Sequence, residues 1–538
     1  MKQPRTLFDN TALGENDNYL EEKNDFFETI HKAKLINAVI EQLPNEDSKN
    51  KMIALFGDWG SGKTSVLKYL EKNSGTNKVI FFEAWKLEND TDLRLSLLET
   101  IMHEAYNIAT DEARYKIKVM GTECIYFFKN ILLGSNIKIG NSFLGVDLNV
   151  GKALEDAKKE VADKFGFNSF YYYSEEFKKK FREIEKLLAN TDEKIIIIID
   201  DLDRCNPDKV IDLLSAIKHF FTFGEKAIYL FALDKNAVNK MIKQRYTDAM
   251  KSEEYLEKIF DLSFHMPTID ENGIDKFIRQ VFTYEIVCYS KGEEEYYESF
   301  IKVLNEFFCS IKFLIPRHLK KIFNKYLLLE FFATNENIKK SLPNEGKYLP
   351  NIVIGEKNKR LSAAGSIFTL YLLILHEHHP RLFKDTIEIE ARISTYEEYA
   401  YKGEELKTKM HPMEWGNINI QELAGRNMYS SLFDISDERE SKFEQTSTHN
   451  FNRLLCLLLP KYTNNKPFQP VLEGAYNYHK YEKMINSYRN HENSITIDFC
   501  LFIHKYFTDK SKNHLYLNGI EDYSLNVIEF AKSLKYLL

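Results

Sequence analysis

The sequence predicts an α/β fold in which a parallel sheet lies between layers of helices and is followed by an all-helical region. The first observation behind this prediction is a run of five isoleucines at 195–199. Such a run suits a strand that is buried on both faces of a parallel sheet. The second is that short apolar runs alternate with helical patterns up to about residue 270, whereas the pattern beyond 270 is almost wholly helical.

Within the first half, the expected elements follow from the spacing of apolar residues. Runs of four to seven apolar residues predict strands, and apolar residues three or four positions apart predict helices. The pattern loosens after about residue 117, where glycines are frequent, and we interpret this stretch as an insertion that could hold a small hairpin. In chain order we expect a helix at 24–43, strands at 52–56 and 78–82, a helix at 93–108, and strands at 194–199, 227–233 and 262–266.

The chain has 538 residues, enough for two or three domains. Changes in composition suggest where these domains begin and end: the first residues are polar, and one later stretch is rich in Asn, Lys, Pro and Gly. The boundaries that we predict are a mobile arm at 1–20, a core at 21–270 with an insertion at about 117–168, a helical lid at 271–333, a linker or insertion at 334–361 and a helical domain at 362–538.

Composition narrows the class of protein. Lys and Arg number 73 against 80 Asp and Glu, which leaves a formal net charge of −7. This balance gives no general attraction to nucleic acid or to an anionic membrane, although it is compatible with a local basic face. The six cysteines include no C-x-x-C pair, and no apolar segment typical of a secretory signal follows the N-terminus. We therefore expect free thiols, no structural zinc and a cytoplasmic location.

Two apolar stretches, at 124–134 and 363–375, are candidates for membrane spans. The first is short and is interrupted by Lys129 and Asn130, and the second contains two hydroxyl residues. Neither reaches the roughly 18 to 20 apolar residues that a helix needs to cross a bilayer. We expect two buried helices and a soluble chain with no membrane span.

A glycine-rich turn between the first predicted strand and the next helix matches the phosphate-binding pattern G-x-x-x-x-G-K-[ST]. In this position backbone N–H groups and a helix N-terminus point at an anion. We expect Lys63 to reach the β- and γ-phosphates of a nucleotide and the Thr64 hydroxyl to ligate Mg²⁺. The alternative is an ordinary strand–helix turn with a surface lysine. The residues expected to bind the nucleotide are Gly57, Asp58, Trp59, Gly60, Ser61, Gly62, Lys63, Thr64 and Ser65.

Two aspartates follow the isoleucine strand. A phosphate-loop enzyme needs a carboxylate at the end of a neighbouring strand to hold Mg²⁺, and a group beside it to orient the attacking water. We expect Asp200 to hold the metal and Asp201 to polarise the water, because adjacent buried carboxylates are costly without a cation. The alternative is a turn in which one aspartate caps a helix. Asp203 and Arg204 form either an ion pair with each other or a subunit contact.

Two later residues complete the predicted catalytic set of Lys63, Asp201, Asp234 and Arg317. Asp234 ends the strand at 227–233, where it either senses the γ-phosphate and aligns water or serves as a helix N-cap. Arg317 occupies the first turn of a predicted lid helix. It either reaches over the phosphates or is an exposed helical arginine.

Several motifs, in this order along the chain, resemble the KAP family of P-loop NTPases over about 20–330. The motifs are the phosphate loop with Trp59, Phe82-Glu83-Ala84-Trp85, Asp200-Asp201-Leu202-Asp203-Arg204-Cys205, Tyr255-Leu256-Glu257-Lys258-Ile259-Phe260, and Pro316-Arg317 with Asn324. The resemblance implies an additional-strand P-loop core that hydrolyses ATP and a helical lid. It also implies the magnesium role for Thr64 and Asp200, the catalytic carboxylate for Asp201 and a lid arginine at Arg317.

Many members of this family carry membrane helices between the phosphate loop and the aspartate strand, where this chain lacks the apolar length. The chain is more similar to soluble bacterial members, which resemble plasmid phage-exclusion proteins and the ATPase subunits of multi-gene antiviral systems such as the Qat type. This similarity implies a role in antiphage defence. Residues 362–538 resemble no family that we can name.

The leading functional hypothesis is an ATP-driven switch or motor that regulates partner proteins, with ATP binding ordering the lid. Such switches often complete their site across a subunit contact, so we expect a homo-oligomer or a complex with products of neighbouring defence genes. The alternatives are a nucleic-acid-stimulated translocase or clamp, supported by basic clusters such as Lys178-Lys179-Lys180, and a nucleotide-stabilised scaffold.

No guanine-reading motif occurs, but the sequence leaves ATP and GTP as alternatives, and we expect adenine contacts from the helix around Phe26 and Phe27. The cluster His376-Glu377-His378-His379 invites a metal-site interpretation. Its spacing does not give H-E-x-x-H, so a polar helix end is the favoured interpretation.

Overall fold

A computed structural model describes the parts of the chain on which the candidate site depends. The predicted arm at 1–20, the predicted hairpin and nearly all of the predicted linker lie outside the described residues. The described ranges are 25–43, 51–133, 170–246, 252–335, 361–387 and 494–508, apart from the single positions 26, 191, 268, 289 and 362, together with a few isolated residues between 340 and 489.

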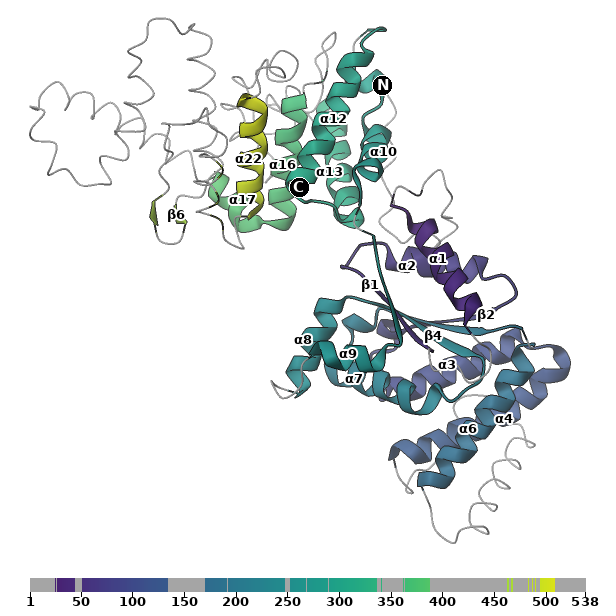
Figure 1. The fold of residues 1–538 in the computed structure, drawn as a ribbon. Coiled ribbons are helices and arrows are strands. Elements are labelled where there is room, and N and C mark those ends of the chain that lie inside the picture. The colour runs from purple at the N-terminus through teal and green to yellow at the C-terminus, as the bar shows by residue number, and fades with distance from the viewer. Residues whose placement is uncertain are drawn as a thin grey trace, which may run out of the picture. The chain divides into compact units, whose positions relative to one another are not determined.

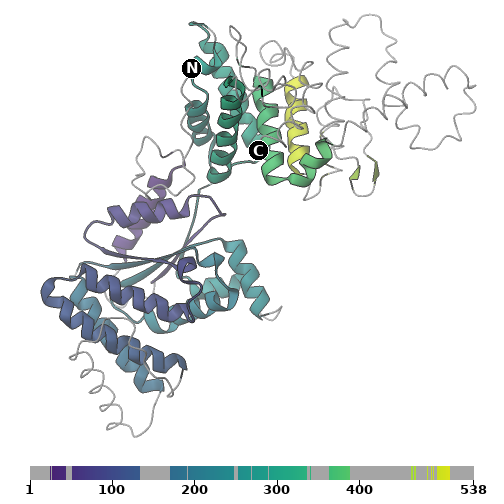
Figure 2. The ribbon, with the colours of Figure 1, turned by 180° about the vertical axis from the view of Figure 1, so that it is seen from behind.

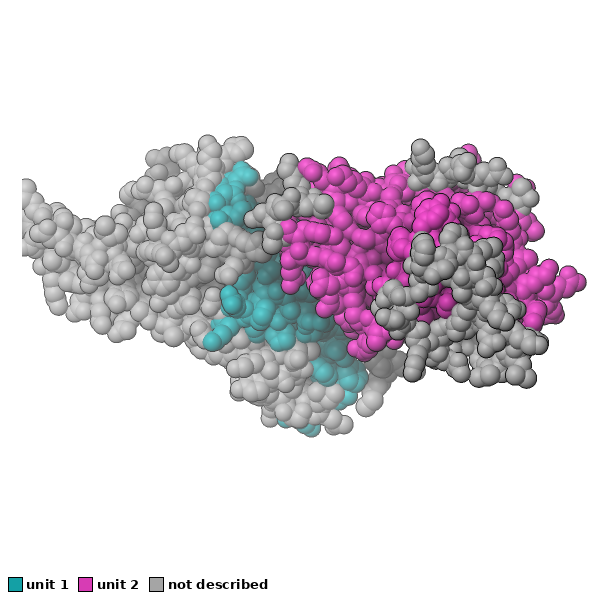
Figure 3. Space-filling model, turned by 90° about the horizontal axis from the view of Figure 1, so that it is seen from below, with its two compact units in different colours: residues 1–10, 269–538 teal, residues 11–268 magenta. Residues whose placement is uncertain are grey.

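The chain divides into two compact units, which Figure 3 shows in different colours. The sheet unit comprises residues 11–268, and the helical unit comprises residues 1–10 and 269–538. The change from one unit to the other falls close to the end of the predicted core at residue 270. Each unit is described by itself.

Five parallel strands form the sheet in the order β2-β3-β4-β1-β5. Strand β4 therefore lies between β1, which leads into the glycine-rich turn, and β3, the isoleucine strand. This is the additional strand that the fold class predicted. Because the strands are parallel, their carboxyl ends lie at one edge of the sheet. The strands are β1 (Met52–Phe56), β2 (Lys78–Glu83), β3 (Ile195–Asp200), β4 (Ala227–Leu233) and β5 (Leu262–His265).

Helices cover both faces of this sheet (Figures 1 and 2). Alternate residues of each strand point to opposite faces, so Ile196 packs with one helical layer and Ile197 with the other. The first layer consists of α1 (Thr29–Gln42) and α2 (Lys63–Asn73). The second contains α3 (Leu93–Ile108), α4 (Asp111–Leu133), α6 (Phe170–Leu188), α7 (Pro207–Ala216), α8 (Lys235–Tyr246) and α9 (Ser252–Ile259). Burial on both faces explains why β1, β3 and β4 are almost continuously apolar.

Helices α4 and α6 lie side by side in the sheet unit (Figure 1). The predicted insertion at about 117–168 therefore begins inside a helix. Aromatic rings hold the pair together: the ring centroids of Phe128 and Phe177 are 5.1 Å apart, and both rings contact Phe221. Phe221 ends a π-helical turn, η4 (Ile217–Phe221), which follows α7.

The described part of the helical unit is built mainly from packed helices. The histidine cluster lies at the end of α16, where Glu377 pairs with Lys325 at 2.5 Å and with Lys321, both from α13. Among the described residues, no helix combines the length and apolar character needed to pass through a membrane. The elements are α10 (Glu271–Val281), α11 (Tyr284–Val287), α12 (Glu294–Ser310), α13 (Pro316–Thr334), α16 (Ala363–His378), α17 (Pro380–Ile387), α22 (Ser494–Thr508), β6 (Tyr462–Thr463) and β7 (Lys466–Pro467).

Candidate nucleotide-binding site

The glycine-rich turn joins the end of β1 to the start of α2, as its motif predicted. Gly60 and Gly62 adopt positive φ angles of 85° and 100°, which favour glycine. At Gly57, an added Cβ would lie 2.6 Å from the Ser61 Oγ atom and 2.7 Å from the Met266 Cγ atom. Each of these three positions therefore favours glycine, and the loop forms a tight cradle at the beginning of a helix.

Two features of the loop fit a bound anion. Helix α2 begins at Lys63, directly after the turn, and the first N–H groups of a helix have no partner within that helix. The Ser61 hydroxyl is buried and has no hydrogen-bond partner among the described residues. Because a buried polar group without a partner is unfavourable, this hydroxyl suits a site that a ligand completes.

The ammonium group of Lys63 folds back over the loop. It donates hydrogen bonds to the carbonyl oxygens of Gly57, at 2.8 Å, and Asp58, at 3.1 Å. Burial lowers the pKa of Lys63, and the surrounding aspartates, Asp203 first among them, oppose this shift. The lysine thus lies between carbonyl oxygens and a group of carboxylates, and it can exchange these partners for phosphate oxygens.

Thr64 and Asp200, the two predicted magnesium ligands, are in contact. The Thr64 hydroxyl donates to the Asp200 Oδ2 atom at 2.8 Å. Asp200 is the last residue of β3 and is only 3% exposed. Burial, together with the neighbouring charge of Asp201, raises the pKa of Asp200 to about 6. A hydroxyl and a buried carboxylate placed together beside a phosphate cradle are a donor set that fits Mg²⁺.

Asp201 follows β3 with a φ angle of 57°, in the left-handed region that is uncommon for residues other than glycine. Its Oδ1 atom lies 2.8 Å from the Nη2 atom of Arg204. Of the two interpretations given for Asp203 and Arg204, the mutual ion pair is replaced by this pairing. The Asp203 carboxylate instead accepts a hydrogen bond from the backbone N–H of Asp234 at 2.8 Å.

Asp234 caps α8. Its Oδ1 atom accepts hydrogen bonds from the backbone N–H groups of Asn236, at 2.9 Å, and Ala237, at 3.1 Å. This contact matches the N-cap interpretation and occupies one carboxylate oxygen. A role of Asp234 towards the γ-phosphate stays a prediction.

The roles of two further expected contributors stay predictions. Arg317 is the second residue of α13 in the helical unit, so its reach over the phosphates stays a prediction. Phe26 lies outside the described residues, and adenine contacts also stay a prediction. The start of α1 does lie near the loop, because the Thr29 Oγ1 atom would be 3.9 Å from a Cβ on Gly62.

The sequence analysis missed Met266. Its side chain packs on the phosphate loop at Gly57, and its backbone N–H donates to the Phe56 carbonyl at 2.7 Å. The signal that could have found it is the position of Met266 at the end of a predicted strand. Only the pairing of β5 with β1, however, brings that end to the phosphate loop.

Comparison with known proteins agrees with this geometry. The family model of the KAP family P-loop domain matches residues 31–337, more than half of the chain. The chain is also similar to two uncharacterized proteins of Methanocaldococcus jannaschii. It is 33% identical to MJ0182 over 165 residues, which cover 27% of this chain and 84% of that protein. It is 32% identical to MJ0181 over 143 residues, which cover 26% of this chain and half of that protein. The chain therefore belongs to the KAP family of P-loop NTPases.

Proposed function

We propose that the protein is a magnesium-dependent ATPase that acts as a nucleotide-driven switch or motor for partner proteins. The observation that carries this proposal is the 2.8 Å contact between Thr64 and Asp200 next to the phosphate loop. These side chains come from different elements and meet only because β3 and the loop end at the same edge of the sheet.

Each residue of the site has a separate task. The loop N–H groups and Lys63 bind the phosphates, for which Lys63 leaves the carbonyls of Gly57 and Asp58. Thr64 and Asp200 would hold Mg²⁺, for which Asp200 must be ionised. Bound there, the ion would supply positive charge that offsets the charge on the phosphate oxygens. Asp201 orients the attacking water and accepts a hydrogen bond from it.

The experiment measures ATP binding and phosphate release by the purified full chain. We expect Lys63→Ala to abolish both, because it removes the charge that meets the phosphates. Asp201→Asn should retain binding and lower kcat by about 10²- to 10⁴-fold. The matched control is Lys68→Ala, five residues further along α2, whose ammonium pairs with Glu71 at 3.1 Å. A wild-type protein that takes up neither ATP nor GTP with Mg²⁺ present contradicts the proposal.

The switch function is supported by the course of the chain. The sheet unit ends at residue 268, two residues after Met266, which packs on the phosphate loop. A conformational change of the loop on nucleotide binding would therefore move Met266 and the chain segment at which the helical unit begins. Limited proteolysis with and without Mg-ATP tests this point. Cleavage sites after residue 269 should change in the wild type and stay the same in Lys63→Ala.

The setting that we propose is antiphage defence, in a homo-oligomer or a complex with products of neighbouring genes. The support is the similarity to phage-exclusion proteins and to the ATPase subunits of antiviral systems. Cells that carry the gene with its neighbours should resist infection, and Lys63→Ala should remove the resistance. Full protection by this variant would contradict a nucleotide-driven role.

A further inference from the structure

Asp201 is held in its left-handed conformation by its own turn. A short 3₁₀ helix, η3 (Leu202–Arg204), follows Asp201 and turns the chain back. The Arg204 guanidinium thereby reaches the Asp201 carboxylate at 2.8 Å, and the Arg204 backbone N–H donates to the Asp201 carbonyl at 3.3 Å. A residue other than glycine keeps a left-handed backbone conformation only where the surrounding structure fixes that conformation. Arg204 contributes to that constraint at both the backbone and the side chain, beside the hydrogen bond that the Asp201 N–H donates to the Asp200 Oδ1 atom at 2.9 Å.

The guanidinium of Arg204 has a second neighbour, Trp85. Its Cζ atom lies 5.2 Å from the centroid of the indole ring, within the range of a cation–π attraction. Trp85 belongs to η2 (Ala84–Leu87), which follows β2, and the register pairs Glu83 with Asp200. The turns after β2 and β3 therefore begin side by side. Trp85 is 51% exposed, so burial of the indole in the core does not account for its position.

One atom of Arg204 is left without a partner. The Nε atom is buried and makes no hydrogen bond with any described residue. An arginine normally uses its donors on carbonyl or carboxylate oxygens. The position of this side chain is therefore set by Asp201 and Trp85, at the expense of one donor.

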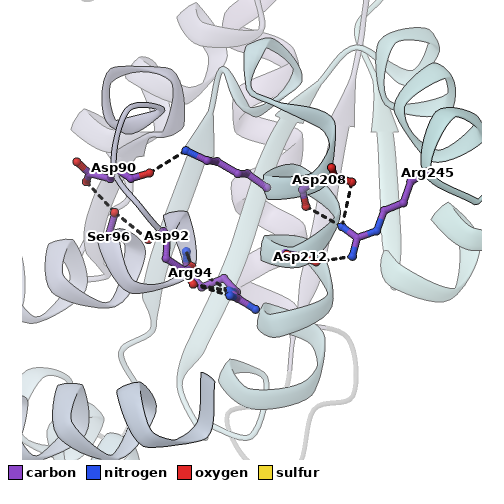
Figure 4. Close-up of polar contacts among 8 residues, drawn as sticks. Asp90, Asp92, Arg94, Ser96, Asp208, Asp212 and Arg245 are labelled. Atoms are coloured by element: carbon purple, nitrogen blue, oxygen red, sulfur yellow. Dashed lines mark hydrogen bonds and ion pairs between the residues drawn. The ribbon is translucent and has the colours of Figure 1, made fainter. Parts of the chain in front are cut away.

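Two other cationic side chains, Lys209 and Arg245, connect the chain segments that contain or follow Arg204 and Trp85. The Lys209 ammonium, near the start of α7, donates to the carbonyls of Glu88, at 2.6 Å, and Asp90, at 2.7 Å. This contact ties the segment after Trp85 to the helix after Arg204. Arg245 of α8 pairs with Asp212 of α7 at 2.8 Å (Figure 4). The chain segments that follow β2, β3 and β4 are thus joined, and Trp85 cannot easily move away from Arg204.

From these contacts we propose that Arg204 and Trp85 are positioning residues for Asp201. Arg204 fixes the carboxylate, and Trp85 fixes the guanidinium. The proposal rests on the water-orienting role proposed above for Asp201. Neither residue needs to touch the nucleotide, so their loss should affect turnover and spare binding.

The experiment compares steady-state ATP hydrolysis with ATP binding in four variants of the full chain. Arg204→Ala should lower kcat by about tenfold to a hundredfold, because a misplaced catalytic group loses that much. The dissociation constant for Mg-ATP should stay within about twofold, since the phosphate loop is intact. Arg204→Lys should restore part of kcat. Trp85→Ala should lower kcat by about two- to fivefold, the worth of one cation–π contact, and Trp85→Phe should lower it less.

Arg114 provides a matched control in α4, outside the site. Its guanidinium also pairs with an aspartate three residues away, Asp111 at 2.6 Å, and lies 5.9 Å from the ring of Tyr106. Its Nε atom is likewise buried without a partner among the described residues. Arg114→Ala should leave kcat unchanged. If Arg204→Ala does not fold, Arg204→Lys and Trp85→Ala carry the test.

Two outcomes would overturn the proposal by themselves. One is a kcat equal to that of the wild type in Arg204→Ala or, if Arg204→Ala does not fold, in both Arg204→Lys and Trp85→Ala. The other is a loss of activity that follows weaker ATP binding. Failure of the proposed function gives a different result, because the wild type itself then shows no ATP hydrolysis that depends on Lys63. That result would contradict both proposals.

Discussion

Charged side chains are buried at both edges of the five-stranded sheet, with different partners at each edge. At the edge where the strands begin, the partners are backbone groups. Glu185 accepts hydrogen bonds from the N–H groups of Glu225, at 2.7 Å, and Ala227, at 2.9 Å. The Lys194 ammonium donates to three carbonyls at the end of α1, those of Ile40, Glu41 and Leu43.

At the edge where the strands end, the charges are placed against one another. Asp200 and Asp201 are adjacent, and the mutual repulsion of their carboxylates contributes to the raised pKa of Asp200. Asp201 has a left-handed backbone, and the Ser61 hydroxyl lacks a partner among the described residues. Partners are incomplete here because, under our proposal, a metal ion and phosphates complete them.

The difference shows how to separate structural from functional charges in one sheet. A buried side chain such as Glu185 stabilises the fold through its hydrogen bonds to backbone groups, although burial raises its pKa, and its loss is expected to lower stability. A buried charge beside a like charge destabilises the ligand-free fold, and its loss is expected to raise stability while it removes function. Each substitution below tests one side of this contrast.

The largest effect is expected for Glu185→Ala at the beginning edge. Glu185 is 2% exposed, and its removal leaves two amides without their acceptor and takes away a negative charge near the Lys51 ammonium. Breaking a buried, hydrogen-bonded charge lowers the free energy of unfolding by about 3–5 kcal/mol. Urea unfolding followed by circular dichroism measures this change. Glu175→Ala, which removes an exposed pair on the same helix, is the control, and equal losses in the two variants would break the comparison.

The opposite sign is expected for Asp200→Asn at the ending edge. The pKa of Asp200 is about 6 in the folded protein, above its ordinary value of 3.8. The folded state therefore keeps a proton that the unfolded chain has released, so stability falls as the pH rises from about 4 to about 6. The free energy of unfolding changes by about 1.4 kcal/mol for each pH unit in this interval, so the whole fall amounts to about 3 kcal/mol.

Asp200→Asn should remove this fall, so at pH 7 without metal the variant should be more stable than the wild type. Urea unfolding in a chelating buffer at about pH 4 and about pH 7 measures the change, because these values lie on either side of the interval in which stability falls. Asp111→Asn, at an exposed position, should keep the wild-type slope. If the free energy of unfolding of Asp200→Asn depends on pH as it does in the wild type, burial does not disfavour the charge at this edge.

The sequence alone predicted the central strands of the sheet and the contact between the phosphate loop and the aspartate that follows the isoleucine strand. The strands at 52–56 and 227–233 and the helix at 93–108 have the predicted bounds, because continuous apolar runs and helical spacing are local signals. The meeting of Thr64 and Asp200 was predictable for a related reason. Parallel strands place their carboxyl ends at one edge, so motifs that follow two such strands come together.

Other parts of the site depend on information that is not local. The pairing of Arg204 with Asp201 depends on the φ angle of 57° at Asp201. The sequence does not predict that angle for an aspartate. The contact of Met266 with Gly57 requires β5 to pair with β1, which lies far from it in the chain. The buried helix predicted at 124–134 is confirmed as the end of α4, but its start at Asp111 was missed because the glycines after it dominated the pattern.

A smaller loss is expected for Lys194→Met. Lys194 is 4% exposed and precedes β3, where its ammonium caps the carbonyl end of α1. Loss of this charge leaves the last carbonyls of α1 without their cation, at a cost of about 1–2 kcal/mol. Amide hydrogen exchange should rise first in α1, since the contact is made there. Lys186→Met, which removes a 60% exposed ammonium from an ion pair, should leave exchange unchanged.

The smallest effect is expected for Lys226→Met, which makes the same kind of contact at a more open position. Lys226 is partly exposed, and its ammonium donates to the carbonyls of Ala189, at 2.8 Å, and Asn190, which is itself exposed. Water can replace the ammonium at Asn190, so the loss should stay below about 1 kcal/mol. If Lys226→Met instead lowers stability as much as Lys194→Met in urea unfolding, the backbone contact alone sets the cost. Burial would then no longer explain why charges at the beginning edge stabilise the fold.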